Sequence, residues 1–128
     1  MKRILLVLSV ILLTAGMASA QQLEAAINVT DSASYDFGEI LEADGPASHV
    51  FTVVNEGEKP LVISRVVPSC GCTTPEWTKE PIAPGKTGEI KVTYNPAGRP
   101  GKFIKTINVY SNGKANGSFL LTIRGSVK

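Results

Sequence analysis

The stretch EIKVTY, residues 89–94, decides the fold. Apolar and polar residues alternate along it, and successive side chains of a β-strand point to opposite faces of a sheet. Ile90, Val92 and Tyr94 therefore share one face, opposite Lys91. A period of two is typical of a strand with one face in a hydrophobic core. We predict a strand here whose Ile90 face is buried.

Similar segments extend in both directions from this stretch, separated by turn residues. Four of them are VFTVV at 50–54, LVISRVV at 61–67, KFIKTINVY at 102–110 and FLLTIRGSV at 119–127. Two short N-terminal segments, AINV from Ala26 and SYDFG from Ser34, resemble one broken edge strand. The connections are rich in Gly, Asn and Pro, which favour turns and hairpins. About seven short strands without a helical period predict an all-β, immunoglobulin-like antiparallel β-sandwich.

Both cysteines lie in one short segment, so no disulfide can join the two predicted sheets. Large apolar side chains from different strands must supply the core. We expect these to be Phe37, Phe51, Ile63, Val92, Phe103, Ile107 and Leu121. Burial of one such side chain is worth about 1.5–3 kcal/mol, so a set of this size can stabilise one domain.

Residues 1–20 have the pattern of a secretory signal peptide. Lys2 and Arg3 precede an apolar run, and the small residues ASA come directly before Gln21. A helix over the apolar run at 4–13 would span only about 15 Å, half of a hydrocarbon core. We therefore expect cleavage before Gln21 and a periplasmic or secreted protein.

Residues 21–128 then form a single immunoglobulin-like domain, because about 100 residues build one core but not two. The whole chain has a formal net charge of +2. Lys2 and Arg3 leave with the signal peptide, so the charges of the domain balance. Its basic residues are scattered, whereas a nucleic-acid backbone needs a concentrated basic face. We expect no nucleic-acid partner and no membrane span after cleavage.

Four segments along the chain carry a family resemblance. They are DFGEI from Asp36, FTVVNEGEKPLVISRVVPSCGCTTPEW from Phe51, IAPGKTGEIKVTYNPAGRPGKF from Ile82, and the closing LTIRGSV. Together they resemble the bacterial domain of unknown function 1573 family, over roughly residues 35–127. The resemblance implies an exported protein with an immunoglobulin-like sandwich related to the pilus-chaperone and major-sperm-protein group. It implies no activity and no catalytic residues.

No set of residues predicts an enzyme. The single histidine, His49, stands at the start of a predicted strand, and nothing in the sequence specifies a Ser or Cys nucleophile for it. A catalytic triad needs its base, acid and nucleophile in contact. PGKTG from Pro84 is similar to the end of a phosphate-binding loop, but that loop needs an earlier Gly where this chain has Glu80. We expect a non-enzymatic protein without a cofactor.

The segment PSCGCTTPEW, residues 68–77, allows several interpretations of Cys70 and Cys72. An oxidising compartment favours a disulfide between them, with Gly71 bending the backbone. Closing so short a loop would restrain the unfolded chain by only about 1.5 kcal/mol. A second interpretation is thiol–disulfide exchange, although the usual redox spacing is two residues and adjoins a helix.

Three further interpretations stay open for Cys70 and Cys72. Two thiolates suit Cu(I) or zinc, but only His49 could add a ligand, which is too few for a closed zinc site. The pair could instead shape the loop and pack as small apolar groups near Trp77, or it could pair with another chain. We expect the pair in a partly exposed loop after the strand at 61–67. Pro68 interrupts strand pairing there, and the Ser, Gly, Thr and Pro residues that follow favour turns.

The candidate thiol or interaction loop therefore contains Cys70, Gly71, Cys72 and Trp77. We expect an exported, non-enzymatic module of the cell envelope that presents loops or an edge strand to a protein or glycan partner. The alternative is an envelope thiol-redox or Cu(I)-handling protein that uses the Cys-Gly-Cys loop. The run Asp31-Ser32-Ala33 also matches a short O-glycosylation pattern, with Ser32 as the acceptor.

Overall fold

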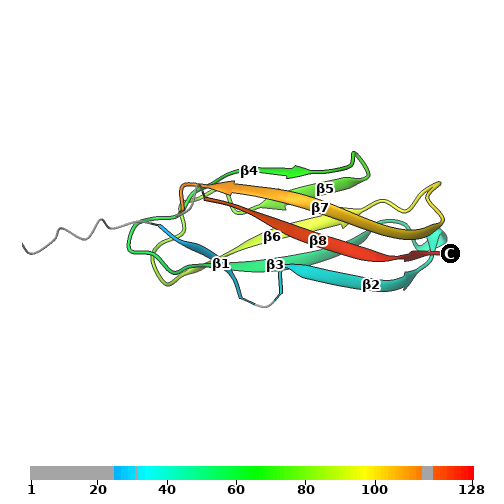
Figure 1. The fold of residues 1–128 in the computed structure, drawn as a ribbon, viewed down its shortest axis with the longest axis horizontal. Helices are drawn as coiled ribbons and strands as arrows, with labels where there is room; N and C mark the ends of the chain where they lie inside the picture. Colours follow the sequence, from blue (N-terminus) through cyan, green and yellow to red (C-terminus); the bar gives the residue numbers. More distant parts are fainter. Residues whose placement is uncertain (1–24, 31, 114–116) are drawn as a thin grey trace, which may run out of the picture.

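The computed structural model describes residues 25–30, 32–113 and 117–128. Within these residues the chain forms eight strands and one short 3₁₀ helix (Figure 1). The elements are β1 (Ile27–Val29), β2 (Ser34–Ile40), η1 (Glu42–Asp44), β3 (Ala47–Asn55), β4 (Ile63–Pro68), β5 (Thr73–Trp77), β6 (Thr87–Tyr94), β7 (Gly101–Ser111) and β8 (Ser118–Val127). The expected signal peptide, residues 1–20, lies outside the described residues.

The strands form two four-stranded sheets packed face to face. One sheet has the strand order β1-β3-β6-β5, and the other has the order β2-β8-β7-β4. This arrangement confirms the immunoglobulin-like sandwich predicted from the sequence, with eight strands in the described residues instead of about seven. No helix in the part of the chain that the structure describes is long and apolar enough to cross a membrane.

Strand β6 has the alternation that its sequence predicts. Ile90, Val92 and Tyr94 are buried and Lys91 is exposed. β6 lies between β3 and β5, with Ile90 opposite Phe51 on one side. A slip of one residue would turn the apolar set toward solvent, so burial of this face determines the register.

The core between the sheets contains almost every side chain expected there. Phe37 is only partly buried and packs against the core from β2. The other six expected residues are buried: Phe51, Ile63, Val92, Phe103, Ile107 and Leu121. Tyr94 and Phe103 stack across the two sheets with ring centroids 4.0 Å apart, so aromatic contact joins the sheets where no disulfide does.

The N-terminal segments differ from the single broken edge strand that the sequence indicated. β1 pairs antiparallel with β3, whereas β2 pairs parallel with β8 in the other sheet. Figure 1 shows β1 and β2 running in the same direction along the sandwich. The chain therefore crosses between sheets without reversing, and it meets β8 in a parallel orientation in an otherwise antiparallel fold.

Candidate functional site

The two cysteines lie in the loop between β4 and β5, at residues 69–72. A disulfide joins Cys70 to Cys72, with the two Cα atoms 5.1 Å apart. The location after β4 agrees with the expectation from the sequence. The exposure differs between the two side chains, because Cys70 is partly exposed whereas Cys72 is 5% exposed and belongs to the core. Of the two residues, only Cys70 is therefore partly open to solvent.

Local hydrogen bonds shape this loop around Gly71. The Cys72 N–H donates to Cys70 Sγ at 3.1 Å, and the Thr73 N–H donates to the Cys70 carbonyl at 3.2 Å. A Cβ built on Gly71 would meet nothing within 4 Å, so Gly71 is open to solvent at the tip. The turn is thus closed by its own backbone and by the disulfide together.

Two other segments hold this loop in place through hydrogen bonds. The Ser69 N–H donates to the Thr106 carbonyl of β7 at 2.9 Å, and the Thr106 N–H donates back to Ser69 Oγ at 3.2 Å. The Asn95 N–H, at the start of the β6–β7 loop, donates to the Cys72 carbonyl at 2.9 Å. Both sheets therefore fix the cysteine loop at its two ends.

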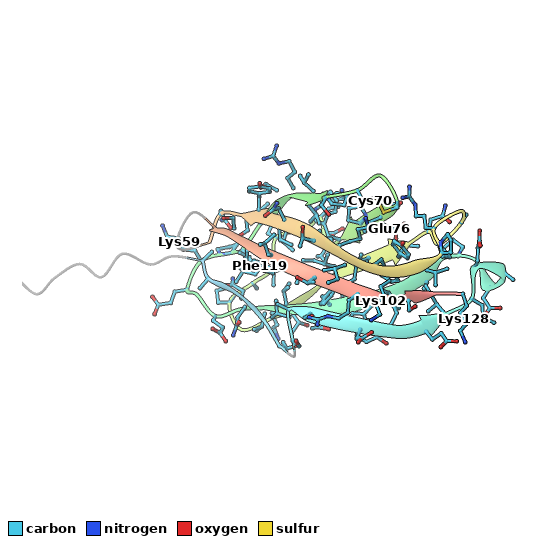
Figure 2. All side chains as sticks on the ribbon, turned by 45° about the vertical axis from the view of Figure 1, so that its right-hand side comes forward. Lys59, Cys70, Glu76, Lys102, Phe119 and Lys128 are labelled. Atoms are coloured by element: carbon cyan, nitrogen blue, oxygen red, sulfur yellow. A yellow bond between two sulfur atoms is a disulfide. The ribbon has the colours of Figure 1, made fainter. Side chains whose placement is uncertain are left out.

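The β6–β7 loop at residues 95–100 is fixed in turn to η1. The Gly98 N–H donates to Glu42 Oε1 at 2.6 Å. We call the three segments 42–44, 69–72 and 95–100 the cysteine-bearing end of the sandwich. Figure 2 shows Cys70 in the same half of the molecule as Lys128, with Lys59 at the opposite end. Three segments far apart in the sequence thus form one surface.

Trp77 does not lie beside the cysteines, contrary to the hypothesis from the sequence. It is the last residue of β5, and five residues of strand place it about 16 Å from Cys72 along the chain. Its ring packs against the core and carries Lys79 Nζ over its face at 3.6 Å from the centroid. Its Nε1 is buried without a hydrogen-bond partner among the described residues. Trp77 is therefore a partly buried side chain that packs against the core at the other end of β5.

Strand β5 itself was not expected, because its sequence TTPEW is rich in turn-forming residues. In the structure Thr73 to Trp77 pair antiparallel with β6, and Thr73 is buried. Two hydrogen bonds show which backbone groups face β6: Thr78 N–H to the Glu89 carbonyl, and Asn95 N–H to the Cys72 carbonyl. Backbone groups alternate in direction along an antiparallel strand, so even-numbered residues face β6. The backbone N–H and C=O groups of the odd-numbered residues of β5 therefore point away from β6, toward the open edge of the sheet.

Pro75 occupies one of these outward positions of β5, where its missing N–H costs the sheet nothing. The same alternation applies to β4, whose residue Ser69 faces β7 through the bonds to Thr106. The backbone nitrogen of Pro68 therefore lies on the side of β4 that faces away from β7. The two strands are edges of different sheets and contact each other on one side of the sandwich. Both edges on that side lack a donor where another strand would need one.

His49 lies on β3 in an aromatic cluster. Its ring stacks on Tyr35 with centroids 3.6 Å apart and meets Phe51 edge-on at 4.7 Å. Across 25–30, 32–113 and 117–128, no group of three or more His, Cys, Asp or Glu side chains could hold a metal ion. The structure therefore does not assemble Cys70, Cys72 and His49 as metal ligands.

The hypothetical glycosylation residue Ser32 is exposed just before β2. Its Oγ accepts a hydrogen bond from the Ser34 N–H at 3.2 Å. Asp31, the first residue of the pattern, lies outside the described residues. Ser32 is therefore exposed, and the hydrogen bond of its hydroxyl oxygen belongs to a local turn.

A basic pocket at the cysteine-bearing end was not foreseen from the sequence. It has a volume of about 510 Å³ and is lined by Tyr94, Gly98, Arg99, Pro100, Lys102, Phe103, Ile104 and Lys105. Its three cations recur at intervals of three residues in the run RPGKFIK. This spacing was the available signal of a basic surface, but the three cations are not consecutive and so do not form a continuous basic run.

Comparisons with known proteins agree with this fold. Residues 28–127 match a family described as "Protein of unknown function (DUF1573)". No protein with curated annotation matches the chain. A protein of unknown function from Porphyromonas gingivalis W83 superposes with a TM-score of 0.71 at 15% identity, over 87% of this chain and 51% of that one. The present chain thus spans about half of that protein's length.

Two further solved structures are similar. The ASH/PapD-like domain 7 of human CEP192 gives a TM-score of 0.63 at 9% identity, over 88% of this chain and 92% of that one. The VesB protease of Vibrio cholerae gives 0.57 at 18% identity, over 82% of this chain and 32% of that one. At these identities the likeness shows a shared sandwich fold.

Proposed function

This chain belongs to the DUF1573 family, and from that premise we propose that it is an exported, non-enzymatic binding module of the bacterial cell envelope. Its partner is an envelope protein or glycan, and it presents the loops of the cysteine-bearing end to that partner. The observation that carries the proposal is the hydrogen-bonded joining of those loops. Binding residues are commonly found on loops that a rigid scaffold positions.

The rigidity of these loops supports recognition without a large ordering cost. The cysteine loop is bonded to β7 through Ser69 and to the β6–β7 loop through Asn95. The β6–β7 loop is bonded to η1 through Gly98. A surface that is ordered before binding loses less conformational entropy when the partner arrives.

On the side where β4 and β5 are the edges, these strands support the choice of loops over strand addition. An incoming strand needs donors and acceptors along an edge. Pro68 and Pro75 point outward from β4 and β5 and supply no N–H. The outward N–H of Thr73 is already bonded to the Cys70 carbonyl at 3.2 Å. Strand addition on this side would therefore leave unpaired groups in the partner.

The non-enzymatic part of the proposal is supported by the packing of His49. It is the single histidine of the chain, and its ring is stacked on Tyr35 in the aromatic cluster. The export part is supported by the signal pattern of residues 1–20.

Site-specific photocrosslinking in the native host tests the proposal. A photoreactive residue at Gly71 or Ala97 probes the cysteine-bearing end, and one at Lys59 probes the opposite end as a matched exposed control. We expect a discrete adduct from Gly71 and Ala97 that excess unlabelled protein competes away, and no such adduct from Lys59. Equal adducts at all three positions, or none at any, would contradict a partner at this end.

A second candidate function is thiol–disulfide exchange, and the unequal exposure of Cys70 and Cys72 favours it. A thiolate of a partner dithiol would attack the accessible Cys70 Sγ, forming a mixed disulfide and releasing Cys72 as the thiolate. The partner's second thiol would then displace Cys70, leaving this chain reduced and the partner oxidised. Counting free thiols on the exported protein before and after dithiol treatment tests this. If the Cys70–Cys72 disulfide stays oxidised after the dithiol treatment, thiol–disulfide exchange is excluded.

A further inference from the structure

Strand β1 covers only part of the outer edge of β3. It ends opposite Val53, partway along β3 (Figure 1), and one more hydrogen bond runs from the Thr30 N–H to the Thr52 carbonyl at 3.0 Å. By Ala33 the chain has reached the other sheet, because the carbonyl of this residue accepts an N–H of β8 at 2.8 Å. On this side, residues 47–51 of β3 therefore pair with no strand in the part of the chain that the structure describes.

The alternation of β3 shows which backbone groups this open edge offers. The Thr52 carbonyl faces β1, whereas the Asn55 N–H faces the β6 side and donates to the Lys86 carbonyl at 3.0 Å. Backbone groups alternate in direction along an antiparallel strand, so even-numbered residues of β3 face away from β6. Ser48 and Val50 thus direct their N–H and C=O groups outward, and both residues are exposed. An extended strand placed there would form two hydrogen bonds with each of them.

The other sheet edges are protected against such pairing, and this one is not. Pro68 and Pro75 remove donors from β4 and β5. A bulge at Gly38, whose φ is 68°, interrupts the pairing of β2 with β8, and β1 has only three residues. Prolines, bulges and short strands are the usual means of protecting an edge. Residues 47–51, ASHVF, contain no Pro, Gly, Asp, Glu, Lys or Arg, and their pairing with β6 is regular.

The side chains beside the open edge favour an apolar segment. Val50 is 41% exposed and lies on the outer face of the sheet, so a residue opposite it can pack against it as a cross-strand pair. On the inner face, the ring of Tyr35 stacks on His49 with centroids 3.6 Å apart, and Tyr35 is 37% exposed. A residue placed opposite His49 therefore meets an aromatic surface.

A second copy of this chain is a poor occupant of the edge. Pairing Ser48 with Val50 of the other copy would place Val53 of that copy opposite Gly45. That part of β3 is already covered by β1 of its own chain. The second copy's β1 would therefore lie between the two chains, against the segment that precedes β3. A free extended segment brings no such neighbour with it.

We propose that the edge at Ser48 and Val50 binds an extended segment of a partner protein, which adds to β3 as an antiparallel strand in line with β1. The ligand is a polypeptide because the edge offers N–H and C=O pairs at every second residue, and an extended peptide backbone matches this spacing. The inference adds a second surface to the proposed function and does not rest on it, since other segments form the cysteine-bearing end.

The peptide acetyl-AINVT-amide tests the edge. It has the sequence of residues 26–30, whose strand β1 pairs with β3 in this orientation. We expect saturable amide shifts at millimolar peptide and slower hydrogen exchange at Ser48 and Val50. Exchange at His49 and Phe51 should not change, because their N–H groups already face β6. This alternation distinguishes strand addition from contact through side chains. Acetyl-AIPVT-amide, in which proline removes the central N–H, should not saturate.

Variants of Val50 provide the comparison from the side of the protein. Val50→Pro removes the outward N–H without removing a bond to β6, and it should weaken peptide binding about five-fold or more. Val50→Thr keeps the N–H and the β-branched shape, and it should bind within about two-fold of the parent. An unaltered far-ultraviolet circular dichroism spectrum will show that each variant is folded. If Val50→Pro does not fold, the proline peptide makes the same comparison.

Three results overturn the inference: slow exchange at Ser48 and Val50 before peptide is added, shifts that do not saturate, and equal binding by the two peptides. Protection that rises with protein concentration alone assigns the edge to a second copy and overturns it too. If the peptide fails while the crosslinks from Gly71 and Ala97 remain, the edge inference falls and the proposed function stands. If the crosslinks fail while the peptide binds, the reverse holds.

Discussion

The backbone N–H of Asn95 donates a 2.9 Å hydrogen bond to the carbonyl of Cys72, one step beyond the last ladder pair of β5 and β6, Thr73 with Tyr94. The cysteine loop is therefore held by a continuation of the sheet as well as by its disulfide. We therefore expect the loop to keep its conformation when the disulfide is removed.

The double change Cys70→Ser with Cys72→Ser should cost less than about 2 kcal/mol of unfolding free energy, because a disulfide that closes so short a loop restrains the unfolded chain weakly. The hydrogen bonds of Asn95 and Ser69 remain in the variant. Urea unfolding with and without reductant measures the cost. A variant without a folded baseline would show that the disulfide maintains the sandwich.

Asn55 should be far more sensitive than either cysteine. It is fully buried at the opposite end, where its Nδ2 donates to the carbonyls of Lys59 at 2.7 Å and Ile82 at 2.9 Å, and its Oδ1 accepts the Gly57 N–H at 2.9 Å. Asn55→Ala leaves these groups unpaired, and we expect a loss of about 2–4 kcal/mol. Thermal or urea unfolding measures it.

Asn112 is the matched control for Asn55. Its side chain also bonds two backbone groups, the Val62 N–H and the Pro60 carbonyl, but it is exposed. Water can replace both bonds, so Asn112→Ala should cost about 1 kcal/mol or less. Equal costs at the two positions would refute the role of burial.

Replacing Pro68 and Pro75 should let the sheet edges at β4 and β5 pair with a strand of another molecule. The variant Pro68→Thr with Pro75→Thr restores two N–H groups on neighbouring edges, and we expect concentration-dependent self-association. Sedimentation velocity measures it. Pro100→Thr, in the exposed β6–β7 loop, should stay as monodisperse as the parent. An unchanged double variant would mean that the edges are protected by something other than proline.

Phe103 should contribute strongly to stability through its contact with Tyr94. Its ring also lies against Gly125, where a Cβ would come within 2.8 Å of Phe103 Cζ. We expect Phe103→Ala to cost about 3–5 kcal/mol, as for other large-to-small changes in cores. Phe119→Ala, at a partly buried position, should cost clearly less. A reversed order in urea unfolding would contradict the importance of this stack.

Export can be checked by intact-mass measurement. If residues 1–20 are a signal peptide, protein recovered from outside the cytoplasm should begin at Gln21. A mass that still contains Met1 to Ala20 would refute cleavage at this position.

The sequence by itself determined the elements whose periodicity is strong. In EIKVTY the alternation identifies both the strand and its buried face, because one face must leave water whichever strands lie beside it. The same reasoning found β3, β4, β7 and β8, and it placed the cysteines after β4. These features depend on neighbours in the sequence, so local chemistry suffices to predict them.

Only the tertiary structure decided the features that depend on pairing between distant segments. TTPEW has turn-forming composition, and it becomes β5 because β6 supplies a partner and leaves Pro75 pointing outward. Trp77 is carried away from Cys72 because that segment is extended. The separation of β1 and β2 into different sheets follows likewise from their partners. Each of these outcomes is set by contacts across the sandwich, and such contacts leave no periodic trace in the residues that make them.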